Sequence, residues 1–207
     1  MPTSTKELFI GTAHLLIGEG EAFNATGDGL VNLGEQAVIS IGTGDGELAY
    51  ARTPSGHRSA SNAIDYGRVP MLDVEADEVT REALGILISG TLVDAQGNIG
   101  FQTEAAAAKT LSALVVPSSN IDGAGAVIDP QKMFWFPFLV GSGSPSFSFN
   151  NERGENANTP VSTQLVGLVG ETYGGAPLPA IARTLYLGNP ADAGLDWKAP
   201  APLQVAA

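Results

Sequence analysis

The chain has 207 residues, of which 43% are hydrophobic and 15% charged, and this composition predicts a single folded domain over 1–207 rather than a disordered chain. Acidic residues outnumber basic ones by 22 to 10, for a net charge of −12, which argues against ordinary nucleic-acid binding because that requires a basic surface. The lack of cysteine excludes disulfides and thiolate chemistry, while 26 glycines and 13 prolines predict many turns and a mainly β fold.

The first predicted strand covers residues 8–18 and is apolar on both of its faces. Leu15 and Ile17 share one face, and Leu16 lies on the other. This pattern is typical of a strand that is covered on both sides. After a turn-rich loop, a second strand is predicted over 33–42, with apolar and polar residues in alternation.

Residues 47–68, with the sequence ELAYARTPSGHRSASNAIDYGR, begin and end like strands but have a polar middle. This middle is far longer than a tight hairpin turn requires. The sequence therefore predicts a long β-hairpin loop at about 52–66, between two strands.

The next strand is predicted over 68–79 and has the clearest alternation in the chain. Leu72 and Val74 alternate with Asp73 and Glu75, which predicts one apolar face and one acidic face.

The spacing of apolar residues becomes helical after this strand. Asp77 is a suitable N-cap, Ile86 and Leu87 belong to an apolar stripe, and Gly90 is a C-terminal stop. A short α-helix is therefore predicted at about 78–89.

The second half of the chain gives weaker signals. A strand is predicted near the end of 103–117, and further strands over 161–170 and 182–188. The Pro- and Ala-rich C-terminus, 189–207, is predicted to be an extended arm.

Aromatic residues concentrate in KMFWFPFLVG, residues 132–141, where Phe134, Trp135 and Phe136 are consecutive. Three interpretations are open: a hydrophobic core, a platform that stacks sugars, or an interface between subunits. A combination of core and interface is favoured because aromatics are enriched at interfaces, so these three residues are candidate interface aromatics.

The sequence offers little chemistry. The only two histidines are His14 and His57, and no zinc, nucleophile-elbow or phosphate-loop motif occurs. Asp73 and Glu75 could form a calcium site or a glycosidase pair, but a solvated acidic face is favoured. We therefore predict no catalytic residue, no metal and no cofactor.

The chain also lacks the signals of export or membrane insertion. No apolar run reaches the ~18 residues of a membrane-spanning helix, and no signal peptide is recognisable. Folding in the cytosol is the expectation.

The order of segments over residues 8–90 resembles the major tail tube protein of long-tailed bacteriophages. The resemblance lies in the strand FIGTAHLLIG, in LVNLGEQAVISIG, and in the polar hairpin followed by the acidic strand and short helix. LGE at 33–35 and LISG at 87–90 occupy the places of the family's turn and helix end.

The resemblance implies a tail-tube-type β-sandwich or barrel that closes into hexameric rings and stacks into a tube. It implies that the hairpin loop reaches a neighbouring subunit, where its basic residues would meet acidic partners. The loop residues given this role are Arg52, Pro54, Gly56, His57, Arg58 and Asp65.

The implied partners are further copies of the chain and the tape measure, terminator and distal tail proteins. The implied location is a virion tail assembled in the host cytoplasm, without a membrane. DNA would pass through the lumen without specific binding.

Asp73 and Glu75 are the candidate residues of the lumen wall, where carboxylates would repel phosphate; the alternative is that they face outside water. A function of another class, a β-sandwich binding module for capsid decoration or for glycans and receptors, also remains open.

Overall fold

The computed structural model describes residues 12–23, 30–33, 38–43, 48–52, 58–65, 69–76, 85–87, 91–93, 96, 98–101, 109–141, 146–147 and 161–195. The fold is mainly β, as the composition predicts. The main sheet has the strand order β2 (Val31–Asn32), β1 (Ala13–Glu19), β9 (Leu111–Pro117), β10 (Phe134–Gly141), β12 (Val161–Gly167), β6 (Pro70–Ala76) and β3 (Val38–Thr43). Two short strands, β11 (Ser146–Phe147) and β15 (Tyr186–Leu187), pair with β12 and β10.

Three two-stranded sheets accompany the main sheet: β4 (Leu48–Arg52) with β5 (Arg58–Asp65), β7 (Thr91–Val93) with β8 (Ile99–Phe101), and β13 (Thr172–Tyr173) with β14 (Ala176–Pro177). The described pairings are all antiparallel. Three short 3₁₀ helices are η1 (Ser118–Asn120), η2 (Ala180–Ala182) and η3 (Pro190–Ala193).

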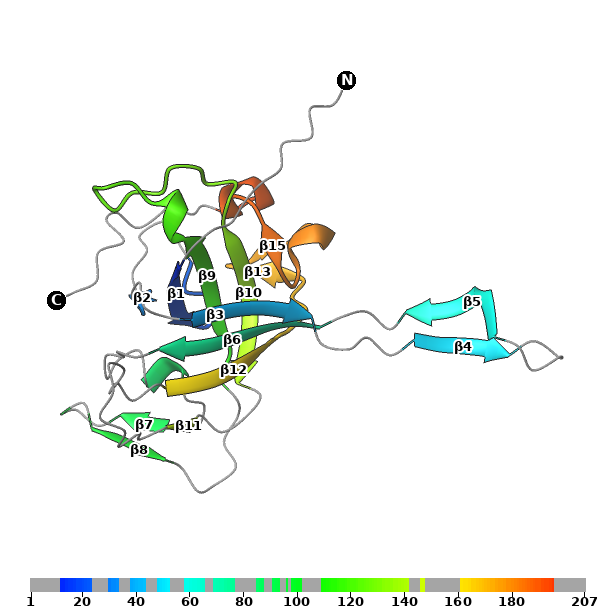
Figure 1. Cartoon of the computed structure of the whole chain (residues 1–207), viewed down its shortest axis with the longest axis horizontal. Coiled ribbons are helices and arrows are strands. Elements are labelled where there is room, and N and C mark those ends of the chain that lie inside the picture. The colour runs from blue at the N-terminus through cyan, green and yellow to red at the C-terminus, as the bar shows by residue number, and fades with distance from the viewer. Residues whose placement is uncertain are drawn as a thin grey trace.

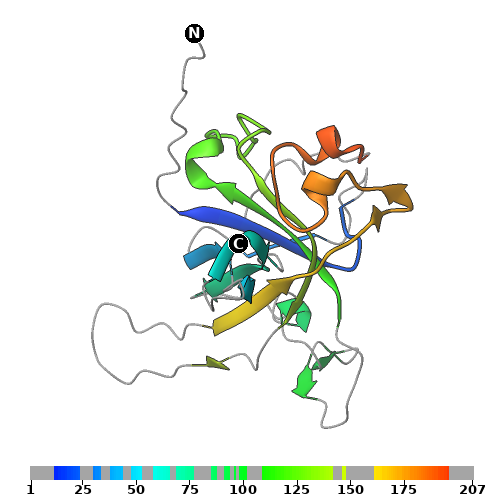
Figure 2. The same ribbon diagram turned by 90° about the vertical axis from the view of Figure 1, so that its right-hand side faces the viewer.

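The main sheet is strongly curved, and its two end strands, β2 and β3, follow one another in the chain. β2 pairs with β1 at one end and β3 pairs with β6 at the other, yet the two are consecutive in sequence. Figures 1 and 2 show β1, β9 and β10 crossing β12, β6 and β3 at a large angle. The register of β10 on β9 shifts between Phe136 and Leu139; such a bulge bends a strand, and it coincides with Pro137.

The first hydrophobic core lies inside this curve. Leu15 and Ile17 of β1 face Leu72 and Val74 of β6 across it, and all four are at most 2% exposed. The buried members of this core are Leu15, Ile17, Leu33, Leu72, Val74, Leu87, Leu111, Ala113, Val115, Phe136, Leu139 and Leu165.

A second hydrophobic core covers the opposite face of β1, β9 and β10. Segment 168–195 packs on that face and contributes Tyr173, Leu178, Ala182 and Ala193. Figure 2 shows this orange segment beside β9 and β10. The remaining buried members are Leu16, Phe23, Leu114, Val116, Met133 and Trp135. The prediction that the first strand is covered on both sides is therefore confirmed for its described residues.

The predicted α-helix at 78–89 is described only at residues 85–87, which are α-helical. Leu87 is buried in the first core and Ile86 packs against it, so the described part of this segment contributes to that core. Residues 77–84 and 88–90 lie outside the described residues.

Two predictions about the C-terminal part were wrong. Only Tyr186–Leu187 of the predicted strand 182–188 is extended as β15, because η2 and its cap at Arg183 occupy the preceding turn. The predicted arm 189–207 is not extended at its start, where η3 buries Ala193 in the second core. Asn189 caps η3 by accepting a hydrogen bond from the Ala191 amide at 3.1 Å. Residues 196–207 lie outside the description.

Candidate assembly site

The segment predicted as a long loop at 52–66 is a β-ribbon. β5 occupies residues 58–65 and pairs with β4 in the register Leu48↔Asp65 to Arg52↔Arg58, with a shift near Arg52. The loop prediction was therefore wrong for most of its length, because Ser, Ala and Asn in this segment adopt a strand although their composition favours turns. Only 53–57 separates the two strands.

The ribbon stands apart from the main sheet. Figure 1 shows β4 and β5 beyond the ends of β3 and β6, which precede and follow them in the chain. Of the residues predicted as intersubunit contacts, Arg52 and Arg58 lie opposite one another and Asp65 lies opposite Leu48. Pro54, Gly56 and His57 are outside the described residues.

The outer face of β12, β6 and β3 is polar and open to solvent; we call it the acidic face and define it by Ser40, Asp73, Glu75, Ser162 and Gln164, all exposed. Asp73 lies between Ser40 of β3 and Gln164 of β12, and Glu75 lies opposite Ser162. The alternation predicted for residues 71–75 is confirmed, since Leu72 and Val74 point into the first core.

The carboxylates of the acidic face have neutral neighbours. Gln164 Nε2 donates a hydrogen bond to Asp73 Oδ1 at 2.8 Å, which holds one carboxylate in place without neutralising it. The described ion pairs lie elsewhere, between Lys109 and Glu19 at 2.5 Å and between Lys132 and Asp129 at 3.5 Å. Residues two apart on a strand are ~7 Å apart, so Asp73 and Glu75 place two negative charges close together, and among the described residues no basic side chain forms an ion pair with either.

The three candidate interface aromatics have unequal burial. Trp135 and Phe136 are 0% exposed, one in each core, whereas Phe134 is partly buried against the first core. The Trp135 ring contacts Tyr173 edge-on at a centroid distance of 5.3 Å and Phe23 at 6.4 Å. Trp135 and Phe136 are therefore core residues. Contact of either side chain with another subunit would require the fold to open.

Sequence reasoning missed several exposed apolar side chains that lie just before β6, just after β12 and in η2. Val69, Leu168, Val169 and Ile181 are 47%, 40%, 75% and 73% exposed. The available signal was "LVGLVG" at 165–170, where apolar residues continue beyond the last position that β12 buries.

The described residues contain no group of three His, Asp or Glu side chains that could hold a metal ion. His14 is buried within β1, and His57 is outside the description. None of the described helices is long and apolar enough to cross a membrane.

Comparison with known proteins gives no family assignment. No protein-family model matches the sequence, and no curated protein matches it either.

Proposed function

We propose that this chain is a structural, non-enzymatic virion protein whose copies assemble into stacked hexameric rings that form the tail tube of a long-tailed bacteriophage. The proposal joins the resemblance over residues 8–90 to a mainly β body that carries a ribbon. DNA would leave the capsid through the lumen, and no bond would be made or broken.

The observation that carries the proposal is the position of the ribbon. β4 and β5 form a sheet of their own between β3 and β6 in the chain, and Figure 1 shows them reaching away from the body. A two-stranded ribbon without a covering layer is marginally stable in water, so this element is suited to contact another molecule. Contact with a neighbouring copy is the use that the resemblance implies.

The acidic face supplies a suitable wall for the lumen. Asp73 and Glu75 are exposed on a smooth strand surface whose other described members are Ser40, Ser162 and Gln164. Repeated around a ring, the carboxylates would repel the phosphates of passing DNA, so the DNA would not bind to the wall of the lumen. We assign this role to Asp73 and Glu75 within the proposal.

The curved sheet supports a tail-tube-type sandwich or barrel. β12, β6 and β3 carry the acidic face outside and the first core inside, and β3 is an end strand of the described sheet. An end strand offers unpaired backbone groups to another chain. Joining β3 to a strand of the next copy would extend the acidic face from subunit to subunit.

The glycan-binding alternative has less support. A sugar-stacking platform needs exposed aromatic faces, whereas Trp135, Phe136, Phe23 and Tyr173 are at most 4% exposed. Sedimentation velocity over a concentration series separates the two functions: a tube protein forms large species as the concentration rises. A binding module remains one chain in size, and its tryptophan fluorescence changes with added glycans.

A further inference from the structure

The acidic face is continuous with an apolar surface on the same side of β6. Side chains alternate between the two sides of a strand, and positions 70, 72 and 74 are buried while 69, 73 and 75 are exposed and 71 is partly exposed. The outer side of β6 therefore carries, in order, Val69, Met71, Asp73 and Glu75. It changes from apolar to acidic within ~20 Å, since a strand rises about 3.3 Å per residue.

β12 shows the same change beside β6. Val166 lies opposite Met71, and Leu168, two positions further along the outer side, is 40% exposed. Val69, at the corresponding position before β6, is 47% exposed. Figure 1 shows the two strands side by side. The apolar side chains at this end of the outer side form what we call the apolar end: Val69, Met71, Val166 and Leu168.

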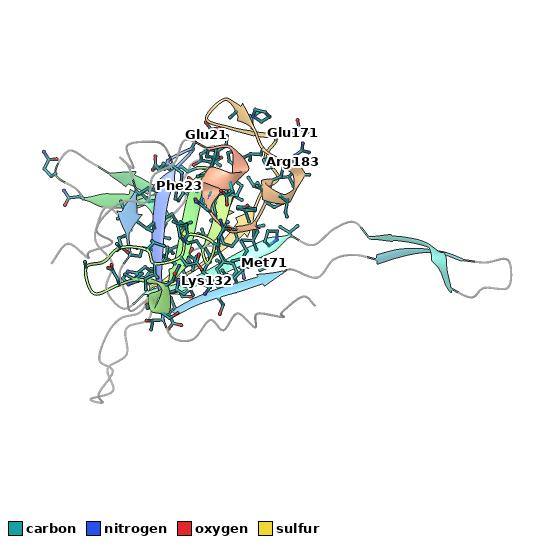
Figure 3. All side chains as sticks on the ribbon, turned by 90° about the horizontal axis from the view of Figure 1, so that it is seen from above. Glu21, Phe23, Met71, Lys132, Glu171 and Arg183 are labelled. Atoms are coloured by element: carbon teal, nitrogen blue, oxygen red, sulfur yellow. The ribbon has the colours of Figure 1, made fainter. Side chains whose placement is uncertain are left out.

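β3 leaves room beside the apolar end. Gly42 of β3 lies opposite Met71, and Figure 3 shows Met71 beside this strand. Gly42 is exposed, and a β-carbon added to it would have no atom within 4 Å. A side chain of another molecule can therefore enter over Gly42 and reach the apolar end.

The acidic face can accept cations from another molecule. Asp73 and Glu75 are exposed, and none of the ion pairs among the described residues includes either of them. Gln164 donates a hydrogen bond to Asp73, which orients this carboxylate and leaves its charge in place. Covering a carboxylate without supplying a cation is unfavourable. A partner that covers both parts must therefore bring cations to the acidic face and apolar groups to the apolar end.

We infer that the apolar end and the acidic face together form a docking surface for a segment of another protein that carries apolar side chains and, next to them on the same side, Lys or Arg. Charge favours this partner over the alternatives. A second copy of the chain has a net charge of −12 and nucleic acid carries phosphates, so Asp73 and Glu75 repel both. The inference goes beyond the proposed function, in which this surface meets only passing DNA. A surface that borders a lumen stays open, so the two assignments are compatible.

The length of the surface defines the partner further. An α-helix rises about 1.5 Å per residue, so about 14 residues of helix lie along the ~20 Å from Val69 to Glu75. One half of such a helix must present apolar side chains and the other half basic ones, along the same side. An ordinary amphipathic helix carries its apolar and polar side chains on opposite sides and would match only one part of the surface.

A pair of synthetic peptides tests this pattern. The block peptide is a stapled helix of about 14 residues with leucines in its first half and lysines in its second half, all on one side. The control peptide has the same composition, with leucines and lysines on opposite sides along its whole length. In fluorescence anisotropy, the chain should bind the labelled block peptide about tenfold more tightly than the control peptide. Equal affinities for the two peptides would overturn the inference, since charge attraction alone would then account for binding.

Variants of each part show whether the block peptide binds at this surface. Val69→Ser with Leu168→Ser removes apolar groups, and Asp73→Asn with Glu75→Gln removes charges. Each pair should weaken binding of the block peptide by about tenfold or more. Only the second pair should also reduce the dependence of the affinity on salt, because salt screens charges and not apolar contacts.

Matched controls make the same changes elsewhere on the molecule. Ile128→Ser with Leu187→Ser removes apolar groups that are 63% and 45% exposed outside this surface, and Glu21→Gln with Glu171→Gln removes two exposed charges. Both controls should bind the block peptide as the wild type does. Urea unfolding verifies that each variant is folded. A folded variant of the surface that binds the block peptide no more weakly than its control would overturn the inference.

Self-association of the same proteins separates this inference from the proposed function. In sedimentation velocity, a loss of self-association confined to the Val69 and Leu168 variant would identify the apolar end as a contact between copies and overturn the inference. Wild-type tubes without a preference for the block peptide would also overturn it and leave the tail-tube proposal standing. Selective binding of the block peptide by a wild type that stays a single chain would support the inference and contradict the tail-tube proposal.

Discussion

The Tyr173 hydroxyl donates a hydrogen bond to Ser112 Oγ at 3.1 Å and thereby ties the C-terminal segment to the middle of the sheet. The same hydroxyl accepts a hydrogen bond from the Phe23 amide at 2.9 Å, and Ser112 Oγ donates to the Gly20 carbonyl at 2.6 Å. The bonds join three chain segments at a place where Tyr173 and Ser112 are almost completely buried.

Removing this hydroxyl should destabilise the fold. In Tyr173→Phe the hydrogen bonds that the hydroxyl makes with the Phe23 amide and with Ser112 Oγ are lost, and we expect the free energy of unfolding to fall by about 1–3 kcal/mol. Urea unfolding followed by tryptophan fluorescence measures the change, since Trp135 packs on this ring. Tyr186→Phe, at a partly buried tyrosine, is the control and should change stability much less; equal losses in the two variants would refute the role of the network.

The stability of the protein should fall at high pH because of the same residue. Burial raises the pKa of Tyr173 from 10.0 to about 12, although its hydrogen bonds with Ser112 and Phe23 partly oppose the shift. The unfolded chain then releases the proton more readily than the folded one, so stability is intact below pH 10 and is lost as the pH rises toward 12. The loss amounts to at most about 3 kcal/mol.

Unfolding curves at pH 9, 10, 11 and 12 measure this effect, and Tyr173→Phe is the control. The variant should show a smaller fall over the interval because it lacks the titrating group. If the free energy of unfolding falls equally with pH in the wild type and in the variant, Tyr173 is not the cause of the loss of stability.

Gly170 should tolerate no larger residue. A β-carbon at this position would overlap the ring of Phe138, which lies against Tyr173 with a centroid distance of 5.5 Å. We expect Gly170→Ala to lower the free energy of unfolding by about 1–3 kcal/mol, as overpacking does. Gly123→Ala is the control, because nothing lies within 4 Å of its added β-carbon. Thermal unfolding of both variants measures the difference in stability. Equal unfolding midpoints of the two variants would contradict the prediction.

Neutralising the acidic face should make the tube retain DNA. Asp73→Asn with Glu75→Gln removes two negative charges from each copy while leaving the buried side of β6 unchanged. We expect assembly to persist and DNA to bind the tubes weakly and in a salt-sensitive way, because phosphate repulsion is reduced. DNA co-sedimentation with assembled tubes at several salt concentrations measures this retention.

The matched control places the same change of charge elsewhere. Glu21→Gln with Glu171→Gln also removes two negative charges per copy, at exposed positions outside the acidic face. If this control retains as much DNA as the Asp73 and Glu75 variant, the acidic face is not the wall of the lumen.

Sequence reasoning located the elements whose alternation was regular. The alternation around Leu72 and Val74 marked the inner and outer faces of β6, and the doubly apolar pattern of the first strand identified the covered strand β1. Both follow from the two-residue period of a strand, which needs no knowledge of distant contacts.

Features that depend on distant contacts were not predictable. The 3₁₀ turn η3 is held by packing of Ala193 in the second core and by a hydrogen bond from Gln131 Nε2 to Asp192 at 2.5 Å, neither of which a local pattern reveals. The ribbon strand β5 was hidden by its polar composition, since cross-strand pairing rather than propensity forms it. Leu168 and Val169 are exposed because they follow the end of β12, and the position of that end depends on pairing with distant strands.

Negative-stain electron microscopy over a concentration series tests the tail-tube proposal most directly, on the wild type and on a variant in which Gly-Ser residues replace 54–64. The proposal predicts rings or tubes with a central hole for the wild type, and a folded variant that forms no tubes. Single-chain particles of the wild type at every concentration would contradict the proposal, and tubes of normal length from the variant would contradict the role of the ribbon.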